Sequence, residues 1–127
     1  MKESALKTTR GTRRGMSPAV LHMLLSLVDG DRHGYALKKA VESRTDGAVK
    51  LGPGTLYEAI ARLQEDGWIK QVGAPEAFPP EDGQKAQRRY YRMTARGLTA
   101  LKAEVERLGQ IVDYARSKAV LGEREPA

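Results

Sequence analysis

The hydrophobic residues of this chain recur at helical spacing in four blocks, with two short strand-like runs between the third and fourth blocks. The first block follows Ser17-Pro18, which combines an N-cap residue with a proline at the first helical position. It is apolar on nearly all sides and stops at Asp29-Gly30, so we expect a central helix. The second block, over about residues 34 to 43, has an apolar and a charged side and predicts an amphipathic helix.

The third block predicts a helix over about residues 53 to 64, whose leucine and isoleucine side chains share one face. Thr55 and Glu58 have the Thr-x-x-Glu spacing of a capping box, so we expect this pair to cap the helix. Tyr57 lies opposite the apolar face and Arg62 flanks that side, and we expect both to be exposed. This helix therefore has one face for the core and one for a partner.

The two strand-like runs, residues 68–72 and 88–93, flank a polar segment rich in proline and glycine and predict a β-hairpin with a long loop. Thr94 is a suitable N-cap for a final helix from residue 95 to about residue 121. The apolar positions of this helix follow a near-heptad order that is typical of a seam for another helix. They are Leu98, Leu101, Val105, Leu108, Val112, Ala115 and Ala119.

The order helix, helix, helix, hairpin, long helix predicts a mainly α fold with a small β-hairpin, namely a winged helix-turn-helix followed by a long C-terminal dimerisation helix. We expect a basic flexible arm over residues 1–15, the winged helix-turn-helix over 16–94, the dimerisation helix over 95–121 and a flexible tail over 122–127.

The final helix is expected to join two copies of the chain. A helix of about 27 residues is about 40 Å long, which is longer than such a small domain can cover. A homodimer buries its seam, with the first helix as a further contact. The expected interface residues are Leu21, Leu24, Leu25, Leu98, Leu101, Val105, Leu108 and Val112.

Composition narrows the possible classes. The 127 residues suit one domain, and 22 Lys and Arg against 16 Asp and Glu give a net charge of +6. The absence of cysteine excludes disulfides, thiol nucleophiles and cysteine-bound zinc. The sequence shows no signal peptide and no apolar stretch near the roughly 20 residues of a membrane span, so we expect a cytoplasmic protein without membrane contact.

The location of the positive charge points to nucleic acid. The second strand and its approach carry basic residues and two tyrosines without an intervening acid, a pattern suited to phosphates. The second helix of a helix-turn-helix pair enters the major groove. Here it is the third helix of the chain, and its first-turn N–H groups can also bind a phosphate. The expected DNA-binding residues are Lys50, Pro53, Gly54, Thr55, Tyr57, Arg62, Lys85, Arg88, Arg89 and Arg92.

Five motifs in order resemble the PadR family of bacterial and archaeal transcriptional regulators. They are residues 33–35 (HGY), 51–57 (LGPGTLY), 62–63 (RL), 66–69 (DGWI) and 89–97 (RYYRMTARG). The resemblance covers roughly residues 16–120 and is closest to the shorter subfamily with a single C-terminal helix. It implies a winged-helix homodimer that represses transcription by binding an inverted-repeat operator, often with release by a small ligand.

Other readings of the sequence remain open. The winged helix can serve as a scaffold for protein interaction through the long helix, or the basic arm and hairpin can bind nucleic acid without sequence preference. An enzyme is not expected, because no nucleophile–base pair or supported carboxylate pair is present. No cofactor or metal site is expected either, since His22 and His33 lack companion ligands and the Gly-Pro-Gly segment lacks the Gly-Lys-Ser/Thr of a nucleotide loop.

Overall fold

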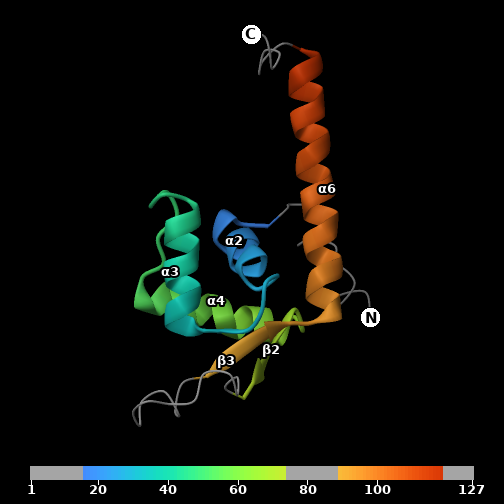
Figure 1. Ribbon diagram of the computed structural model, residues 1–127. Coiled ribbons are helices and arrows are strands. Elements are labelled where there is room, and N and C mark those ends of the chain that lie inside the picture. The colour runs from blue at the N-terminus through green and yellow to red at the C-terminus, as the bar shows by residue number, and fades with distance from the viewer. Residues whose placement is uncertain (1–15, 74–88, 119–127) are drawn as a thin grey trace. The chain divides into compact units, whose positions relative to one another are not determined.

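The computed structural model describes residues 16–73 and 89–118 (Figure 1). Residues 16–101 form one compact unit, and α6 from Lys102 onward belongs to a second. In the first unit α4 lies crosswise to α3 and next to the hairpin strands (Figure 1). The elements are α2 (Pro18–Ser26), β1 (Arg32–His33), α3 (Gly34–Arg44), α4 (Pro53–Glu65), β2 (Ile69–Val72), β3 (Tyr90–Met93) and α6 (Ala95–Ser117).

Two of the N-caps expected from the sequence are confirmed. The Ser17 hydroxyl accepts a hydrogen bond from the Val20 N–H (3.2 Å), and the Thr94 hydroxyl accepts one from the Gly97 N–H (3.0 Å). Both satisfy a backbone donor that the first turn of a helix leaves without an intrahelical partner. The start of α3 has a less common cap, the His33 side chain.

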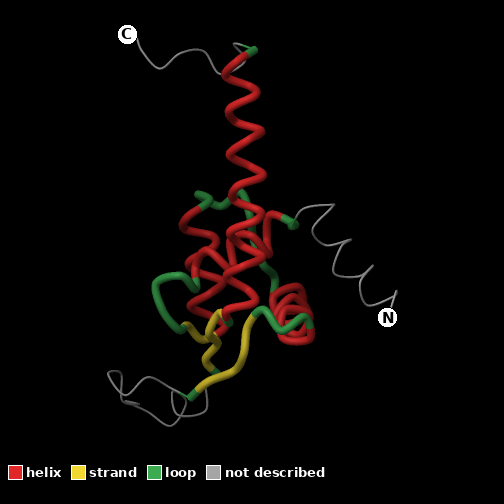
Figure 2. The backbone as a smooth tube through the Cα atoms, turned by 90° about the vertical axis from the view of Figure 1, so that its right-hand side faces the viewer, coloured by secondary structure: helices red, strands yellow, loops and turns green. Residues whose placement is uncertain are grey.

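The sheet has one strand more than the expected hairpin. Its order is β1-β3-β2 and both pairings are antiparallel, so β3 is the central strand (Figure 2). Arg32 of β1 lies opposite Tyr91, and Lys70 of β2 lies opposite Arg92. β1 has only two residues, too few to show an alternating pattern, and therefore could not be read from the sequence.

The C-terminal end of α2 is hydrogen-bonded to β1 and to α3. Ser26 is fully buried, and its hydroxyl donates to the His22 carbonyl (2.7 Å) and accepts from an Arg44 guanidinium nitrogen (2.8 Å). The Arg32 Nε donates to the Ser26 carbonyl (2.7 Å). These bonds satisfy polar groups that burial would otherwise penalise, and they fix β1 beside α2.

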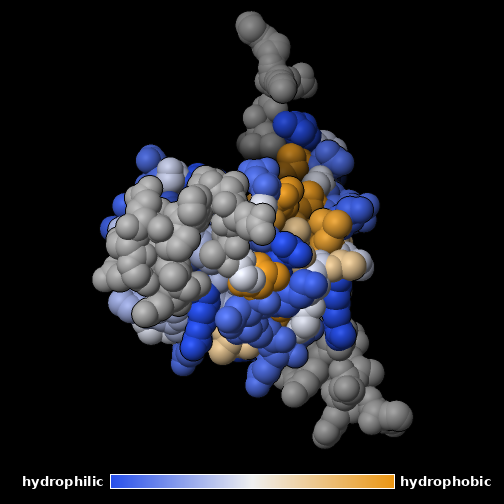
Figure 3. Space-filling view, turned by 60° about the horizontal axis from the view of Figure 1, so that its bottom comes forward, coloured by the Kyte–Doolittle hydropathy of each residue, from blue (hydrophilic) through white to orange (hydrophobic). Residues whose placement is uncertain are grey.

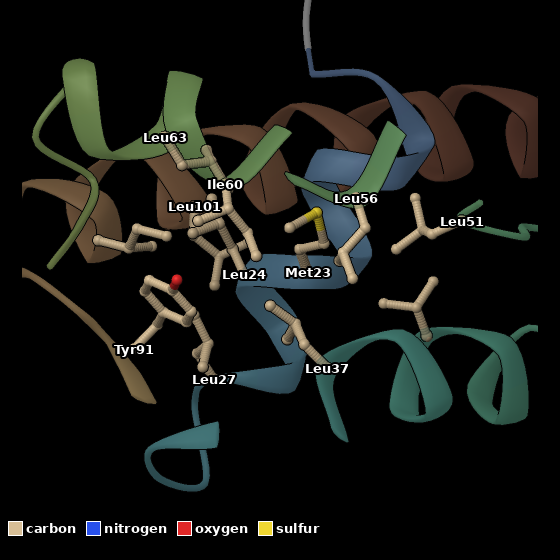
Figure 4. Packing of buried hydrophobic residues seen from close by; sticks show 12 residues of the cluster. Met23, Leu24, Leu27, Leu37, Leu51, Leu56, Ile60, Leu63, Tyr91 and Leu101 are labelled. Carbon is tan, nitrogen blue, oxygen red and sulfur yellow. The ribbon is translucent and has the colours of Figure 1, made fainter. Parts of the chain in front are cut away.

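One hydrophobic core joins α2, α3, α4, the sheet and Leu101 of α6 (Figure 4). Met23 and Leu24 of α2 are fully buried at its centre, which confirms the expected central position of the first helix. α4 contributes one apolar face and β3 contributes Tyr91 (Figure 4). The cluster consists of Met23, Leu24, Leu27, Leu37, Val41, Leu51, Leu56, Ile60, Leu63, Ile69, Tyr91 and Leu101.

The hairpin is bonded to the start of α6 through Thr94. Its hydroxyl donates to the Gly67 carbonyl (2.6 Å), and its N–H donates to the Trp68 carbonyl (2.9 Å). Gly67 has a positive φ of 78°, which glycine adopts without steric cost. The turn after α4 and the first turn of α6 therefore form one hydrogen-bonded junction.

Candidate nucleic-acid interface

α4 begins earlier than its expected capping box. Gly52 is the N-cap, Pro53 occupies the first helical position, and no side chain caps the helix. Thr55 is thus the third helical residue, and the expected capping pair with Glu58 is wrong. Proline's fixed φ favours the first helical position, and this local preference sets the boundary here.

α4 separates a buried face from an exposed one. Leu56, Ile60 and Leu63 are each 2% exposed and point into the core, as Figure 4 shows. On the other side Tyr57 is 57% exposed and Arg62 is exposed as well, as the helical spacing predicted. The helix therefore presents an aromatic ring and a guanidinium group on the side away from the core.

The remaining expected contacts near α4 gather at its N-terminal end. Lys50 is exposed just before the helix, and Pro53, Gly54 and Thr55 are exposed in its first turn. Because no side chain caps this turn, its backbone N–H groups remain available to an anion. The structure thus brings these four residues together at one end of the helix.

β3 places its two tyrosines inside the domain. Tyr90 and Tyr91 are 7% and 3% exposed, so both pack within the protein. Burial raises the pKa of the Tyr91 phenol above its usual value. The charge and hydrogen bond of Arg89 lower this pKa in part, and the Tyr57 phenol raises it further. Arg89 thus lies within hydrogen-bond reach of the Tyr91 phenol. Arg89 itself is exposed.

Arg92 is engaged by an acid that sequence analysis missed. Its Nε and one terminal nitrogen donate to the two Asp31 carboxylate oxygens (3.0 and 2.9 Å). These hydrogen bonds raise the pKa of Arg92. The side chain still has half of its surface exposed (53%), but two of its five donors are occupied. Lys85 and Arg88, also expected to bind DNA, lie outside the described residues.

The expected dimer contacts divide into buried and exposed groups. Leu24 and Leu101 are 0% and 4% exposed within the chain's own core and have little surface left for a partner. Leu21, Leu25 and Leu108 are half-buried. The residues with open surface are Leu98 (38%), Val105 (46%) and Val112 (39%).

α6 exposes two further apolar residues that the heptad reading omitted. They are Ile111, at 50% exposure, and Tyr114, at 66%. Figure 3 shows hydrophobic residues gathered along α6 with hydrophilic residues beside them. Leu98, Val105 and Val112 recur every seven residues along one side of α6, and we call these three residues its apolar strip. Ile111 and Tyr114 lie outside the strip, Tyr114 on nearly the opposite side of the helix.

The described residues hold neither a group of metal ligands nor a membrane-spanning helix. No group of three His, Asp or Glu side chains among them is arranged to hold a metal ion. None of the described helices is long and apolar enough to cross a membrane.

The geometry defines a class of protein, the winged helix-turn-helix. α3 and α4 form the helix pair, β2 and β3 form the wing, and a long helix follows. The chain belongs to the transcriptional regulator PadR-like family, whose sequence model matches residues 21–103. The family expected from the motifs is thereby confirmed, and the protein is a transcriptional regulator of a DNA-binding class.

The chain is also similar to solved structures and to a sequence relative. A transcriptional regulator from Clostridium thermocellum is 28% identical, with a TM-score of 0.61 over 78% of this chain and 87% of that one. A PadR family transcription regulator from Clostridium difficile shares the fold at 22% identity, with a TM-score of 0.63 over 80% and 97%. An uncharacterized 37.1 kDa protein in transposon TN4556 of Streptomyces fradiae is 32% identical over 93 residues, 73% of this chain. The chain spans 24% of that relative's length.

Proposed function

We propose that this PadR-like regulator is a homodimeric repressor that reads an inverted-repeat operator and is released by a small ligand. The observation that carries the proposal is the two-faced recognition helix α4. Its apolar face is buried in the core, while Tyr57 and Arg62 on the other side are exposed. A recognition helix of this kind enters the major groove and contacts base edges near its N-terminal end.

Basic side chains around α4 support contacts with phosphates. Lys50 precedes the helix, Arg89 precedes β3, and Lys70 lies on β2, all of them exposed. Phosphate contacts of this kind supply affinity and register without reading sequence, whereas contacts to bases supply specificity. We therefore assign sequence reading to the exposed face of α4 and general affinity to the basic residues.

The apolar strip of α6 supports the homodimer. The helix has 23 residues and is about 35 Å long, and the three residues of the strip, Leu98, Val105 and Val112, are each more than a third exposed. A second copy of the same helix would cover such a strip. Two recognition helices related by a two-fold axis bind half-sites about 34 Å apart, which makes the operator an inverted repeat.

Release by a small ligand rests on the family resemblance, which favours a site near the dimer centre. A ligand acting there must bind the free dimer more tightly than the DNA-bound one, since only such a difference shifts the equilibrium. Full retention of DNA binding across a broad library of small molecules would remove this part of the proposal.

The proposal is tested by selecting genomic fragments with the purified protein at physiological salt, alongside Tyr57→Ala and Tyr35→Ala. Tyr35 is a matched control because it is also 57% exposed but lies on α3. We expect wild type and Tyr35→Ala to enrich the same few inverted repeats, and Tyr57→Ala to lose the enrichment. Uniform recovery by all three proteins would indicate a binder without sequence preference. No recovery by any of them would favour a protein-interaction module.

A further inference from the structure

We propose that Gly34 is a positioning residue for DNA reading. Because glycine has no side chain, the Tyr57 ring packs directly against the backbone of Gly34, and we call this packing site the seat of Tyr57. This inference rests on the proposed reading role of α4. The glycine is the second residue of the HGY motif, residues 33–35, at the start of α3.

The Tyr57 ring lies against the space that a side chain at position 34 would fill. A Cβ atom on Gly34 would meet both the Cε1 atom and the hydroxyl oxygen of Tyr57 at 3.5 Å. Gly34 is buried, whereas Tyr57 remains 57% exposed. One edge of the ring, including the hydroxyl, is therefore held by the protein, and the rest of the ring faces outward.

The backbone at Gly34 is fixed from its N-terminal side. His33 is the N-cap of α3, and its Nδ1 accepts a hydrogen bond from the Ala36 N–H (3.1 Å). The imidazole also lies edge-on to Tyr90, with ring centroids 5.3 Å apart, and His33 pairs with Tyr90 in the sheet. The seat of Tyr57 is thus tied to the wing strand as well as to α3.

The size of the residue at position 34 decides where the ring lies. An added Cβ stands in ordinary van der Waals contact with Tyr57 and 3.7 Å from Ile60 Cδ1, so alanine fits. Valine adds two methyl groups to that Cβ, and these would lie closer to Tyr57 or Ile60 than van der Waals contact allows. Ile60 is 2% exposed and enclosed by the core, so the exposed Tyr57 ring is the group that yields.

The test compares Gly34→Ala and Gly34→Val, each with Tyr57 present and with Tyr57→Ala. The quantity measured is affinity for the selected operator divided by affinity for scrambled DNA of equal length. We expect Gly34→Ala to keep this ratio and Gly34→Val to lower it about tenfold, the effect of one lost contact between the outward-facing part of the ring and a base. With Tyr57→Ala in place, Gly34→Val should have no further effect.

Each alternative outcome is decisive. An unchanged ratio for Gly34→Val, with a reduced ratio for Tyr57→Ala, overturns the positioning role and leaves the proposed function intact. An unchanged ratio for Tyr57→Ala overturns both. An equal loss from Gly34→Val in the two backgrounds shows that it does not act through Tyr57.

A second measurement does not depend on whether Gly34→Val folds. In wild-type protein with labelled tyrosine, the Tyr57 ring protons next to the hydroxyl should show a strong nuclear Overhauser effect to the Gly34 α-protons. The same effect should persist in Tyr35→Ala, where the seat is untouched. Its absence in the folded wild type overturns the inference directly.

Discussion

Gly97, in the first turn of α6, lies directly against the backbone carbonyl of Trp68, and a Cβ atom at this position would overlap that oxygen. The same carbonyl accepts a hydrogen bond from the Thr94 N–H (2.9 Å). Glycine is required here by close approach of two backbones. The turn after the recognition helix and the first turn of α6 are in contact without any side chain between them.

Replacing Gly97 by alanine should therefore destabilise the protein. We expect the free energy of unfolding to fall by about 2 to 3 kcal/mol, because a backbone shift is needed to admit the methyl group. Gly109→Ala is the matched control, since no atom lies within 4 Å of a Cβ there, and it should stabilise α6 by up to about 1 kcal/mol. Denaturant titration at one protein concentration checks both values. A loss of similar size in the two variants would contradict the close approach.

Thr94→Ala should weaken the same junction by a different route. The substitution removes both the N-cap of α6 and the hydrogen bond to the Gly67 carbonyl. We expect a loss of about 1 to 2 kcal/mol in the free energy of unfolding. Thr94→Ser keeps the hydroxyl and should recover most of this loss in the same titration. If serine is no better than alanine, the hydroxyl's bonds do not stabilise the junction.

The two described arginines of the wing should differ in their contribution to DNA affinity. Arg89→Ala should reduce the slope of log affinity against log salt by about one, as expected for one lost phosphate contact. Arg92→Ala should change the slope less, because Asp31 already holds its guanidinium. Binding to scrambled DNA over a range of salt concentrations measures both slopes. Equal reductions would mean that Arg92 leaves Asp31 when DNA binds.

A charge in the apolar strip of α6 should separate the two copies of the homodimer. Val105→Asp places a carboxylate where we expect a dry contact, and its desolvation should weaken dimerisation at least about tenfold. Gln110→Asp, at an exposed polar position of the same helix, should leave dimerisation unchanged. Sedimentation velocity over a concentration series measures the association. A dimer that tolerates Val105→Asp would exclude this strip as the interface.

The sequence predicted those features of the fold that depend on near neighbours. Ser17 and Thr94 act as the expected caps, and the buried and exposed faces of α4 follow its helical spacing. The predicted cap at Thr55 is wrong, because Gly52 is the N-cap, three positions before Thr55, and Pro53 begins the helix.

The features that the sequence did not reveal depend on contacts between distant segments. Asp31 and Arg92 are 61 residues apart, and nothing in the spacing of either residue indicates the other. Leu24 and Leu101 belong to apolar patterns that suit a core and an interface equally well, and only burial shows that they lie in the core. The seat at Gly34 is likewise a property of two helices packed together, since Tyr57 lies on the second of them.

The two-residue strand β1 also affects how copies of the protein meet in concentrated solution. By pairing with β3, it leaves the described part of the sheet with open edges only along Arg32–His33 and Ile69–Val72. The second of these edges carries the exposed Lys70. Short, charged edges are poor templates for adding a strand from another molecule. The strand that contains His33 therefore also protects the protein against aggregation through its sheet edges.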